Sequence, residues 1–218
     1  MRVVVTGASH GIGRSIVEKF LFEGHEVFGL DIDSSDIDTD CKRYNHTVCD
    51  VSKKESLPDI DSVEILINNA GVQDDEMSID VNLFGVINCT EKYGVQSHIK
   101  SIVNIASASA HSGAEFPRYS ASKGGVLAYT KNTALRIAIF GATCNSISPG
   151  GVMTQINDHI MNNPDLWEQV MEETLLPKWA SANEIADWVY FVSVINKSMT
   201  AQDILIDNGE MAKSKFVW

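Results

Sequence analysis

A tyrosine and a lysine four residues apart, Tyr119 and Lys123, are the side chains of this 218-residue chain best suited to proton transfer. They stand in the segment Tyr-Ser-Ala-Ser-Lys, within a pattern that predicts a helix over residues 118–140, so that the two side chains share one helix face. Free tyrosine has a pKa near 10, about three units too high for a base at neutral pH. A nearby ammonium favours the phenolate. The pair therefore predicts a tyrosine that acts as a general acid or base.

A glycine-rich turn near the N-terminus has the composition of a phosphate-binding loop. Gly7, Gly11 and Gly13 lie in Thr-Gly-Ala-Ser-His-Gly-Ile-Gly, between a predicted strand and a predicted helix. Glycines allow a tight turn and a close approach of backbone N–H groups to a pyrophosphate, which the helix dipole also favours. The spacing differs from the commonest dinucleotide fingerprint, and such a turn can be structural only. Its place directly after the first strand favours a dinucleotide site.

An acidic residue at the end of the second predicted strand bears on the choice of dinucleotide. Asp31 lies 18 residues after Gly13. An acid near this distance accepts hydrogen bonds from the adenosine ribose and repels a 2′-phosphate. His10 and Ile32 occupy the two positions where Arg or Lys would neutralise that phosphate. We expect NAD rather than NADP, and the alternative is a solvated carboxylate at a strand end.

The elements that must position these residues alternate between short β-branched runs and helical patterns. Near-continuous apolar runs are typical of parallel strands covered on both faces. Strands are predicted over residues 2–6, 26–31, 43–48, 64–68, 101–106, 143–148 and 203–206, and helices over 11–23, about 75–98, 118–140, 164–174 and 183–196. The alternation predicts one α/β domain over residues 1–218, a doubly wound parallel sheet (Rossmann fold) of about seven strands with helices on both faces.

Two local patterns refine this outline. Ser181-x-x-Glu184 is a capping-box sequence at the start of the last predicted helix. Residues 155–177 are irregular and rich in Met and Asn, which predicts a substrate-binding loop or lid. Trp167, Met171 and Trp179 could form an apolar substrate wall there or serve ordinary packing.

The composition disfavours several classes of function. The net charge of −12 repels phosphate backbones, so no nucleic acid partner is expected. The four cysteines form no C-x-x-C pair and the six histidines form no metal-binding pattern, so we expect free thiols in a reducing compartment and no metal site. The chain enters a strand at once, without a signal peptide, and its longest apolar stretch is too short to cross a bilayer. We therefore expect a cytoplasmic protein without a membrane partner.

Further short motifs accompany Tyr-Ser-Ala-Ser-Lys in one order along the chain. They are Thr6 to Gly13, Asp50-Val51, Asn68-Asn69-Ala70-Gly71, Val81 to Gly85, Asn104 to Ser107, Asn145 with Pro149-Gly150, Thr154, and Ile206 to Gly209. Each motif is weak alone, but the ordered set at this length is highly specific. Because of this set of motifs, the chain resembles the single-domain short-chain dehydrogenases/reductases over essentially its whole length.

The resemblance implies a role for each matching residue. The cofactor-binding residues would be Gly7, Ser9, His10, Gly11, Ile12 and Gly13 around the pyrophosphate, Asp31 at the adenosine ribose, Asp50 and Val51 at the adenine, Asn69, Ala70 and Gly71 along the cleft, Tyr119 and Lys123 near the nicotinamide ribose, and Pro149, Gly150, Val152 and Thr154 around the carboxamide. The catalytic residues would be Asn82, Ser107, Tyr119 and Lys123.

The implied reaction is hydride transfer between NAD and a secondary alcohol or ketone. Tyr119 would take the alcohol proton, with its pKa lowered by Lys123 and by the positive nicotinamide ring. Ser107 would hold the substrate oxygen, and Asn82 would orient a water that carries the proton out. Taken singly, Ser107 is also an ordinary strand-end residue, and Asn82 could be a structural buried amide. His111, between Ser107 and Tyr119, could touch substrate or lie on a loop surface.

Three functions stay open at this stage. The first is an NAD-dependent dehydrogenase or reductase of a small alcohol or ketone whose identity the sequence does not name. The second is a 3-oxoacyl thioester (acyl-carrier-protein) reductase, which usually uses NADPH and which Asp31 disfavours. The third is a non-catalytic NAD-binding regulatory protein. The segments after Val51 and Gly71 are short for the family, which would leave one cleft wall open. Family members commonly pair through their two long helices, so the resemblance also implies a homo-oligomer, dimer or tetramer.

Overall fold

The computed structural model describes residues 1–37, 42–73, 76–114 and 116–213, and its centre is one seven-stranded sheet. Every strand pair in this sheet is parallel, and the strand order is β3-β2-β1-β4-β5-β6-β9. The strands are β1 (Arg2–Thr6), β2 (Glu26–Asp31), β3 (Tyr44–Val48), β4 (Ile65–Asn68), β5 (Ser101–Ile105), β6 (Thr143–Pro149) and β9 (Asp203–Ile206). This arrangement confirms the predicted doubly wound α/β fold.

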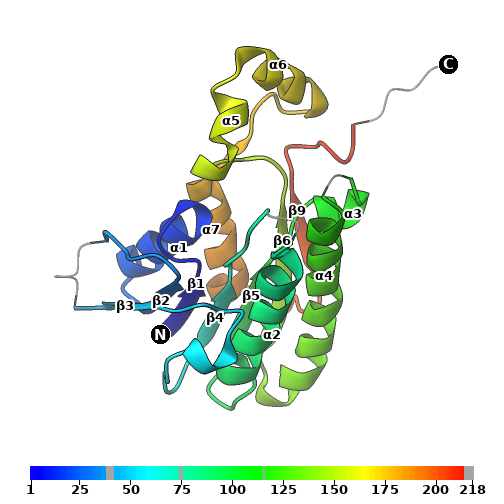
Figure 1. The fold of residues 1–218 in the computed structure, drawn as a ribbon. Coiled ribbons are helices and arrows are strands. Elements are labelled where there is room, and N and C mark those ends of the chain that lie inside the picture. Colours follow the sequence, from blue (N-terminus) through cyan, green and yellow to red (C-terminus); the bar gives the residue numbers. More distant parts are fainter. Residues whose placement is uncertain (38–41, 74–75, 115, 214–218) are drawn as a thin grey trace.

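Helices cover both faces of the sheet (Figure 1). The helices α1 (Gly11–Phe22) and α7 (Ala182–Tyr190) pack together on one face, while α2 (Gly85–Cys89) and α4 (Pro117–Ile137) lie on the other. Shorter helical segments are η1 (Lys54–Ser56), η2 (Ile79–Phe84), η3 (Thr90–Gly94), α3 (Ser109–Ser112), η4 (Ala138–Phe140), η5 (Gln155–Asn157), α5 (Asp158–Met161), α6 (Pro164–Glu173) and η6 (Phe191–Ile195). Among the described residues no helix combines the length and the apolar character needed to span a membrane.

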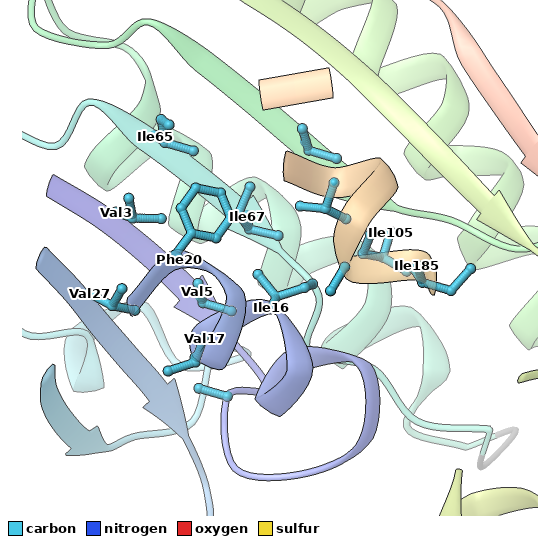
Figure 2. Close-up of a cluster of buried hydrophobic side chains, with 14 of the residues drawn as sticks. Val3, Val5, Ile16, Val17, Phe20, Val27, Ile65, Ile67, Ile105 and Ile185 are labelled. Atoms are coloured by element: carbon cyan, nitrogen blue, oxygen red, sulfur yellow. The ribbon is translucent and has the colours of Figure 1, made fainter. Parts of the chain in front are cut away.

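Side chains alternate between the two faces of the sheet along each strand, so that each face carries its own hydrophobic core. Val3 and Val5 of β1 face the α1 side, whereas Val4 between them faces the α2 and α4 side. Helix α1 contributes Ile16 and Phe20, one turn apart, to the first core (Figure 2). Because both sheet faces are covered, β1 and β4 are buried almost throughout, which explains their continuous apolar sequences.

The structure departs from the sequence expectations mainly in the helices. The helix expected over about 75–98 runs from Ile79 to Gly94 and is π-helical at both ends, and residue 75 lies outside the described residues. Residues 155–177 are more regular than expected, because η5, α5 and α6 occupy most of them. The capping box of Ser181 and Glu184 is confirmed at the start of α7.

Two strands of two residues each went unpredicted. β7 (Val152–Met153) pairs with β8 (Ala180–Ser181) in a separate small sheet. Two residues are too few to show an alternating pattern, so the sequence carries no signal for them. The pairing brings the two ends of the intervening segment, residues 154–179, together beside the main sheet.

A buried polar network ties the sheet to the helices of one face. Asn104 of β5 donates from Nδ2 to Thr130 Oγ1 on α4 at 2.8 Å, and its Oδ1 accepts from Asn68 Nδ2 of β4 at 2.8 Å. Asn68 also donates to Thr90 Oγ1 at 3.1 Å. All four residues are buried, so each hydrogen bond replaces water that cannot enter. The network therefore fixes the position of α4 on β5.

Replacing Asn104 by Ala should lower the free energy of unfolding by about 2–4 kcal/mol, because it opens a cavity and leaves partners unpaired. Urea denaturation measures this loss. Asn162→Ala, at an exposed position, is the matched control and should change the same quantity by less than about 0.5 kcal/mol. Equal effects of the two substitutions would contradict the assigned role of the network.

Candidate active site

The first turns of α4 bring the tyrosine and the lysine to the carboxyl end of β5. Pro117 opens the helix at a position where its missing N–H costs nothing, and Phe116 precedes it with a left-handed backbone of φ 39°. The Lys123 Nζ lies 5.7 Å from the centre of the Tyr119 ring. The structure thus places the two side chains on one face of α4, as the four-residue spacing predicts.

The side chain of Ser107, which follows β5, lies close enough to the Tyr119 hydroxyl to influence its ionisation. Burial raises the pKa of Tyr119, and the Ser107 hydroxyl opposes that shift. The direction differs from the lowered pKa expected from the sequence. Burial is the largest cause of the shift, and the neighbouring ammonium donates to a backbone carbonyl.

Lys123 is buried, with 4% of its surface exposed. Its Nζ donates a hydrogen bond of 2.9 Å to the carbonyl oxygen of Ile105. Burial lowers the pKa of Lys123 to about 8. Within the described part of the chain no carboxylate forms an ion pair with it. An ammonium offers three donors, so two remain for other oxygen atoms.

Asn82 lies in the π-helical segment η2 and is fully buried. Its Oδ1 accepts from the backbone N–H of Val72 at 2.8 Å, and its Nδ2 donates to the Val72 carbonyl at 2.9 Å and to Ser122 Oγ at 3.2 Å. A Cβ on Gly71 would lie 3.2 Å from Asn82 Oδ1 and 3.4 Å from Lys123 Nζ. The side chain of Asn82 therefore holds the loop after β4 beside Lys123, and its part in a proton relay stays a prediction.

The glycine turn after β1 forms a cradle that side chains would fill. A Cβ on Gly13 would lie 1.8 Å from the carbonyl oxygen of Gly7, and one on Gly7 would lie 2.8 Å from the Cα of Ala70. Asn69 closes the cradle from the next strand, since its Nδ2 donates to the carbonyls of Thr6 and Gly7 at 3.1 Å each. The contacts require glycine at both positions if the turn is to keep this shape.

The cradle leads into an uncapped helix N-terminus. His10 precedes α1 without any side-chain capping hydrogen bond, and the first turn of the helix holds no acidic residue. First-turn N–H groups have no acceptor inside the helix, so they point outward as donors beside the positive end of the dipole. The uncapped N-terminus of this twelve-residue helix, beside the glycine cradle, fits a pyrophosphate group.

Asp31 lies at the far side of the cradle with 9% of its surface exposed. Its Oδ2 accepts from the backbone N–H of Ser9 at 2.8 Å, and its Oδ1 accepts from that of Asp33 at 3.1 Å. Each oxygen retains a lone pair. The nearby basic side chains contact other carboxylates: His10 Nε2 lies 3.3 Å from Asp33 Oδ2, and Arg14 pairs with Glu18 and Asp36.

Asp50 and Val51 lie at the same end of the site, after β3. The Ser52 side chain donates to Asp50 Oδ1 at 2.6 Å and, with Lys53, lowers the pKa of this carboxyl. The short segment that follows holds the single helical turn η1. Val51 packs so closely on α2 that a Cβ on Gly85 would lie 2.7 Å from it.

One cleft of about 590 Å³ unites most of the predicted residues. The predicted residues that line it are Gly7, His10, Gly11, Ile12, Asp31, Asp50, Val51, Asn69, Ala70, Gly71, Ser107, Tyr119, Lys123, Pro149, Gly150, Val152 and Thr154. Ser9 lines an adjoining cavity, Gly13 is enclosed by the turn, and Asn82 stands behind the wall. The volume lies within the range of small-molecule and cofactor sites.

Several lining residues were not predicted. They are Leu30, Ile32, Asp33, Cys49, Val72, Gln73, Met77, Val81, Ile105 and Ala106. Asp33, two residues after Asp31, was detectable from its place beyond the strand end. Gln155, Ile156 and Asn157, at the start of the expected substrate loop over residues 155–177, also line the cleft.

The segment over the open side of the cleft is fastened at its base by aromatic packing. Trp179 is buried and contacts Trp167 of α6 in an edge-on arrangement with ring centres 5.2 Å apart. A Cβ on Gly151 would lie 2.1 Å from the Trp179 indole. Trp179 thus serves packing rather than lining the cleft, as one of the two sequence interpretations held.

The chain matches known proteins over most of its length. A family model described as short chain dehydrogenase matches residues 1–165. The 3-oxoacyl-(acyl-carrier-protein) reductase of Staphylococcus epidermidis is 29% identical over 238 aligned residues, which cover 94% of this chain and 97% of that protein.

Solved structures resemble it equally broadly. The aldohexose dehydrogenase of Thermoplasma acidophilum is 27% identical with a TM-score of 0.87, covering 100% of this chain and 96% of that one. A 4-hydroxyisoleucine dehydrogenase complexed with NADH is 27% identical with a TM-score of 0.88, covering 98% and 99%.

Replacing Lys123 by Met should make the relative stability of the two proteins depend on pH. The folded wild type loses the Lys123 proton near its lowered pKa of about 8, while the unfolded chain keeps it up to the ordinary value of 10.5. Between about pH 8 and pH 10.5 the unfolded state binds more protons than the folded state, so the stability of the wild type rises with pH. Below about pH 8 the folded protein carries the buried charge, and its full cost in stability is present.

We therefore expect the free energy of unfolding of the wild type, relative to Lys123→Met, to rise by about 2 kcal/mol between about pH 7.5 and about pH 10. Urea denaturation across this range measures the difference. Lys131→Met, at an exposed lysine of the same helix, is the control and should show a flat difference. A flat profile for the Lys123 variant would mean that its ammonium is not buried as described.

Proposed function

The chain belongs to the short-chain dehydrogenase family, and from this premise we propose that it transfers a hydride between NAD and a secondary alcohol or ketone. Membership makes the protein an oxidoreductase of CH–OH or keto groups that uses a nicotinamide cofactor. The single observation that carries the proposal is the meeting of Tyr119, Ser107 and Lys123 at one end of the cleft that the glycine cradle opens.

The residues of the cleft fit a dinucleotide. The glycine cradle and the uncapped start of α1 suit the pyrophosphate, and Asp31 keeps a lone pair on each oxygen for ribose hydroxyls. NAD is favoured over NADP because Asp31 and Asp33 would repel a 2′-phosphate, while the basic side chains within reach, His10 and Arg14, contact carboxylates. The relative 4-hydroxyisoleucine dehydrogenase is complexed with NADH, which agrees with this preference.

The proposed chemistry divides among three side chains. When bound, the nicotinamide accepts or donates the hydride. In oxidation, Tyr119 takes the alcohol proton at the substrate oxygen, and in reduction it returns that proton. Ser107 donates a hydrogen bond to the same oxygen and keeps it in line with Tyr119. Lys123 uses its two remaining donors for ribose hydroxyls and keeps a positive charge near the phenol, which favours the phenolate.

The remaining cofactor-binding assignments are part of the same proposal. The lining positions Asn69, Ala70 and Gly71 would follow the cofactor between its two ribose rings, and Val152 and Thr154 would meet the carboxamide beyond Pro149 and Gly150. The segment 155–177 would act as a lid over the substrate, supported by the places of Gln155, Ile156 and Asn157 in the cleft wall.

A panel of alcohols and ketones with each cofactor tests the main proposal. Secondary alcohols, aldoses and hydroxy amino acids, offered with NAD⁺ or NADP⁺, should give NADH formation with at least one compound, and 3-oxoacyl thioesters should give little oxidation of NADPH. The thioester arm tests the second candidate, which the Staphylococcus epidermidis relative favours and Asp31 disfavours. Binding of NAD without turnover of any compound would instead support a regulatory protein.

Assembly and location are also proposals. Leu135, near the end of α4, and Ile139, in the following η4, are 78% and 84% exposed, which supports pairing with a second copy of the chain through the helices of this face. Cys49, Cys89 and Cys144 are buried and unpaired in the described structure, which supports a reducing compartment such as the cytoplasm.

Replacing Tyr119 by Phe should lower kcat by about 10²–10⁴-fold, because the proton acceptor at the substrate oxygen is lost. Binding of NAD⁺, followed by protein fluorescence, should stay near the wild-type level. Tyr129→Phe, an aromatic of the same helix outside the cleft lining, is the control. Retention of near wild-type turnover by Tyr119→Phe would remove the proposed mechanism.

Replacing Asp31 by Asn should shift cofactor preference toward NADP. The ratio of kcat/KM for NAD⁺ to that for NADP⁺ should fall at least about tenfold, since ribose hydrogen bonds to a charged acceptor are weakened and the repulsion of phosphate is reduced. Asp61→Asn removes the same charge from an exposed position and should leave the ratio unchanged. An unchanged ratio in the Asp31 variant would show that the discrimination lies elsewhere.

A further inference from the structure

Ser109 donates two hydrogen bonds to the hydroxyl oxygen of Ser107. The Ser109 hydroxyl lies 2.9 Å from Ser107 Oγ, and the Ser109 backbone nitrogen lies 3.2 Å from it. A serine hydroxyl has two lone pairs and one hydrogen. When both lone pairs accept from Ser109, the hydrogen of Ser107 is left to point into the cleft, which Ser107 and Tyr119 both line.

The turn that carries Ser109 is anchored independently of the cleft. Ser109 begins α3, and His111 in the same turn places Nε2 at 2.8 Å from Asp203 Oδ2 on β9. The other oxygen of Asp203 accepts from Ser146 Oγ at 2.6 Å and from Ser148 Oγ at 2.9 Å, both on β6. The carboxylate thus fastens α3 to two strands of the main sheet.

His111, Asp203 and Ser148 do not form a second catalytic triad. The same nitrogen, Nε2, approaches both the Asp203 carboxylate and Ser148 Oγ, the latter at 3.4 Å. A relay needs the carboxylate on one ring nitrogen and the hydroxyl on the other. His111 is exposed and does not line the cleft, and its contacts with Asp203 and Ser148 indicate an anchor.

We propose that Ser109 is a positioning residue that orients the Ser107 hydroxyl, so that Ser107 donates its one hydrogen toward Tyr119 in the absence of substrate and to the substrate oxygen once substrate is bound. The inference rests on the oxidoreductase function proposed above. Ser109 lies two residues from Ser107 and outside the cleft lining, and it acts through Ser107 alone. Without the Ser109 side chain, the Ser107 hydroxyl can rotate, because the backbone N–H of residue 109 is then its only local donor among the described contacts.

Three variants test the proposal: Ser109→Ala removes the donor, Ser109→Thr keeps a hydroxyl, and Ser112→Ala is the control in the same turn. With the most active alcohol of the panel, Ser109→Ala should lower kcat about three- to tenfold, the effect of one hydrogen bond, and leave the Kd for NAD⁺ unchanged. Ser109→Thr should restore most of the loss, and Ser112→Ala should match the wild type.

A second readout does not depend on turnover. Ultraviolet absorbance of tyrosinate, taken as the difference from Tyr119→Phe in each background, follows ionisation of Tyr119 with NAD⁺ bound. The midpoint should move upward in Ser109→Ala, because a disoriented Ser107 stabilises the phenolate less, and should return in Ser109→Thr.

The outcomes separate the two levels of inference. An unchanged kcat and an unchanged Tyr119 midpoint in Ser109→Ala would overturn the positioning role. A loss of kcat accompanied by equal losses in NAD⁺ binding and in thermal stability would also overturn it, since it would indicate a structural role only. Absence of turnover in every variant, wild type included, would defeat the proposed function, while the Tyr119 midpoint would still decide the part of Ser109.

Discussion

The ammonium of Lys123 is buried at the carboxyl end of β5, where the Ile105 carbonyl accepts a hydrogen bond from it. Burial of a charge without an ionic partner costs free energy, and the lowered pKa of about 8 is the same cost expressed in protons. The rest of the protein must hold the charge in place. The buried network through Asn104 fixes α4 on the sheet, and Asn82 holds the loop beside the ammonium. Packing elsewhere in the fold therefore offsets a local destabilisation that serves the site.

A second constraint is that an acidic protein must hold an anionic cofactor. The chain has a net charge of −12. In the proposed function, the neutral N–H donors of the uncapped α1 and of the glycine cradle bind the phosphates, while Asp31 is held in place by two backbone N–H groups. Under the same proposal, the carboxylates beyond the turn after β1 disfavour the additional negative charge of a 2′-phosphate.

The sequence predicted what depends on local pattern and missed what depends on assembly. The limits of β1, β2 and β9 were predicted to the residue, because apolar runs end there at polar or glycine positions. The four-residue α3 has no period to detect, so neither its existence nor the contact of Ser109 with Ser107 was predicted. The π-helical turn at Asn82 also leaves no local signal.

The direction of the Tyr119 pKa shift shows the same limit in electrostatic terms. Spacing on a helix correctly predicted that Tyr119 and Lys123 share a face, but it carried no information on solvent exclusion or on the Ile105 carbonyl that draws the ammonium. Burial acts on both members of the pair, raising the pKa of the phenol and lowering that of the ammonium. Both shifts favour the neutral forms in the protein itself, so the balance between phenol and phenolate depends on charge brought close to the pair.

The segment between β7 and β8 differs from the rest of the site in how it is stabilised. Its return point is held to the main fold, since the N–H groups of Leu175 and Leu176 both donate to the Asn208 carbonyl at 3.0 Å. Between its ends, α5 and α6 bury no residue fully, and α6 is defined locally by the cap at Asn163 and by Pro164. Regions with few buried apolar contacts open at low free energy. Under the proposed lid role, residues on these helices can therefore change without disturbing the cradle or the pair on α4, so that substrate contacts could vary while the reacting groups stay fixed.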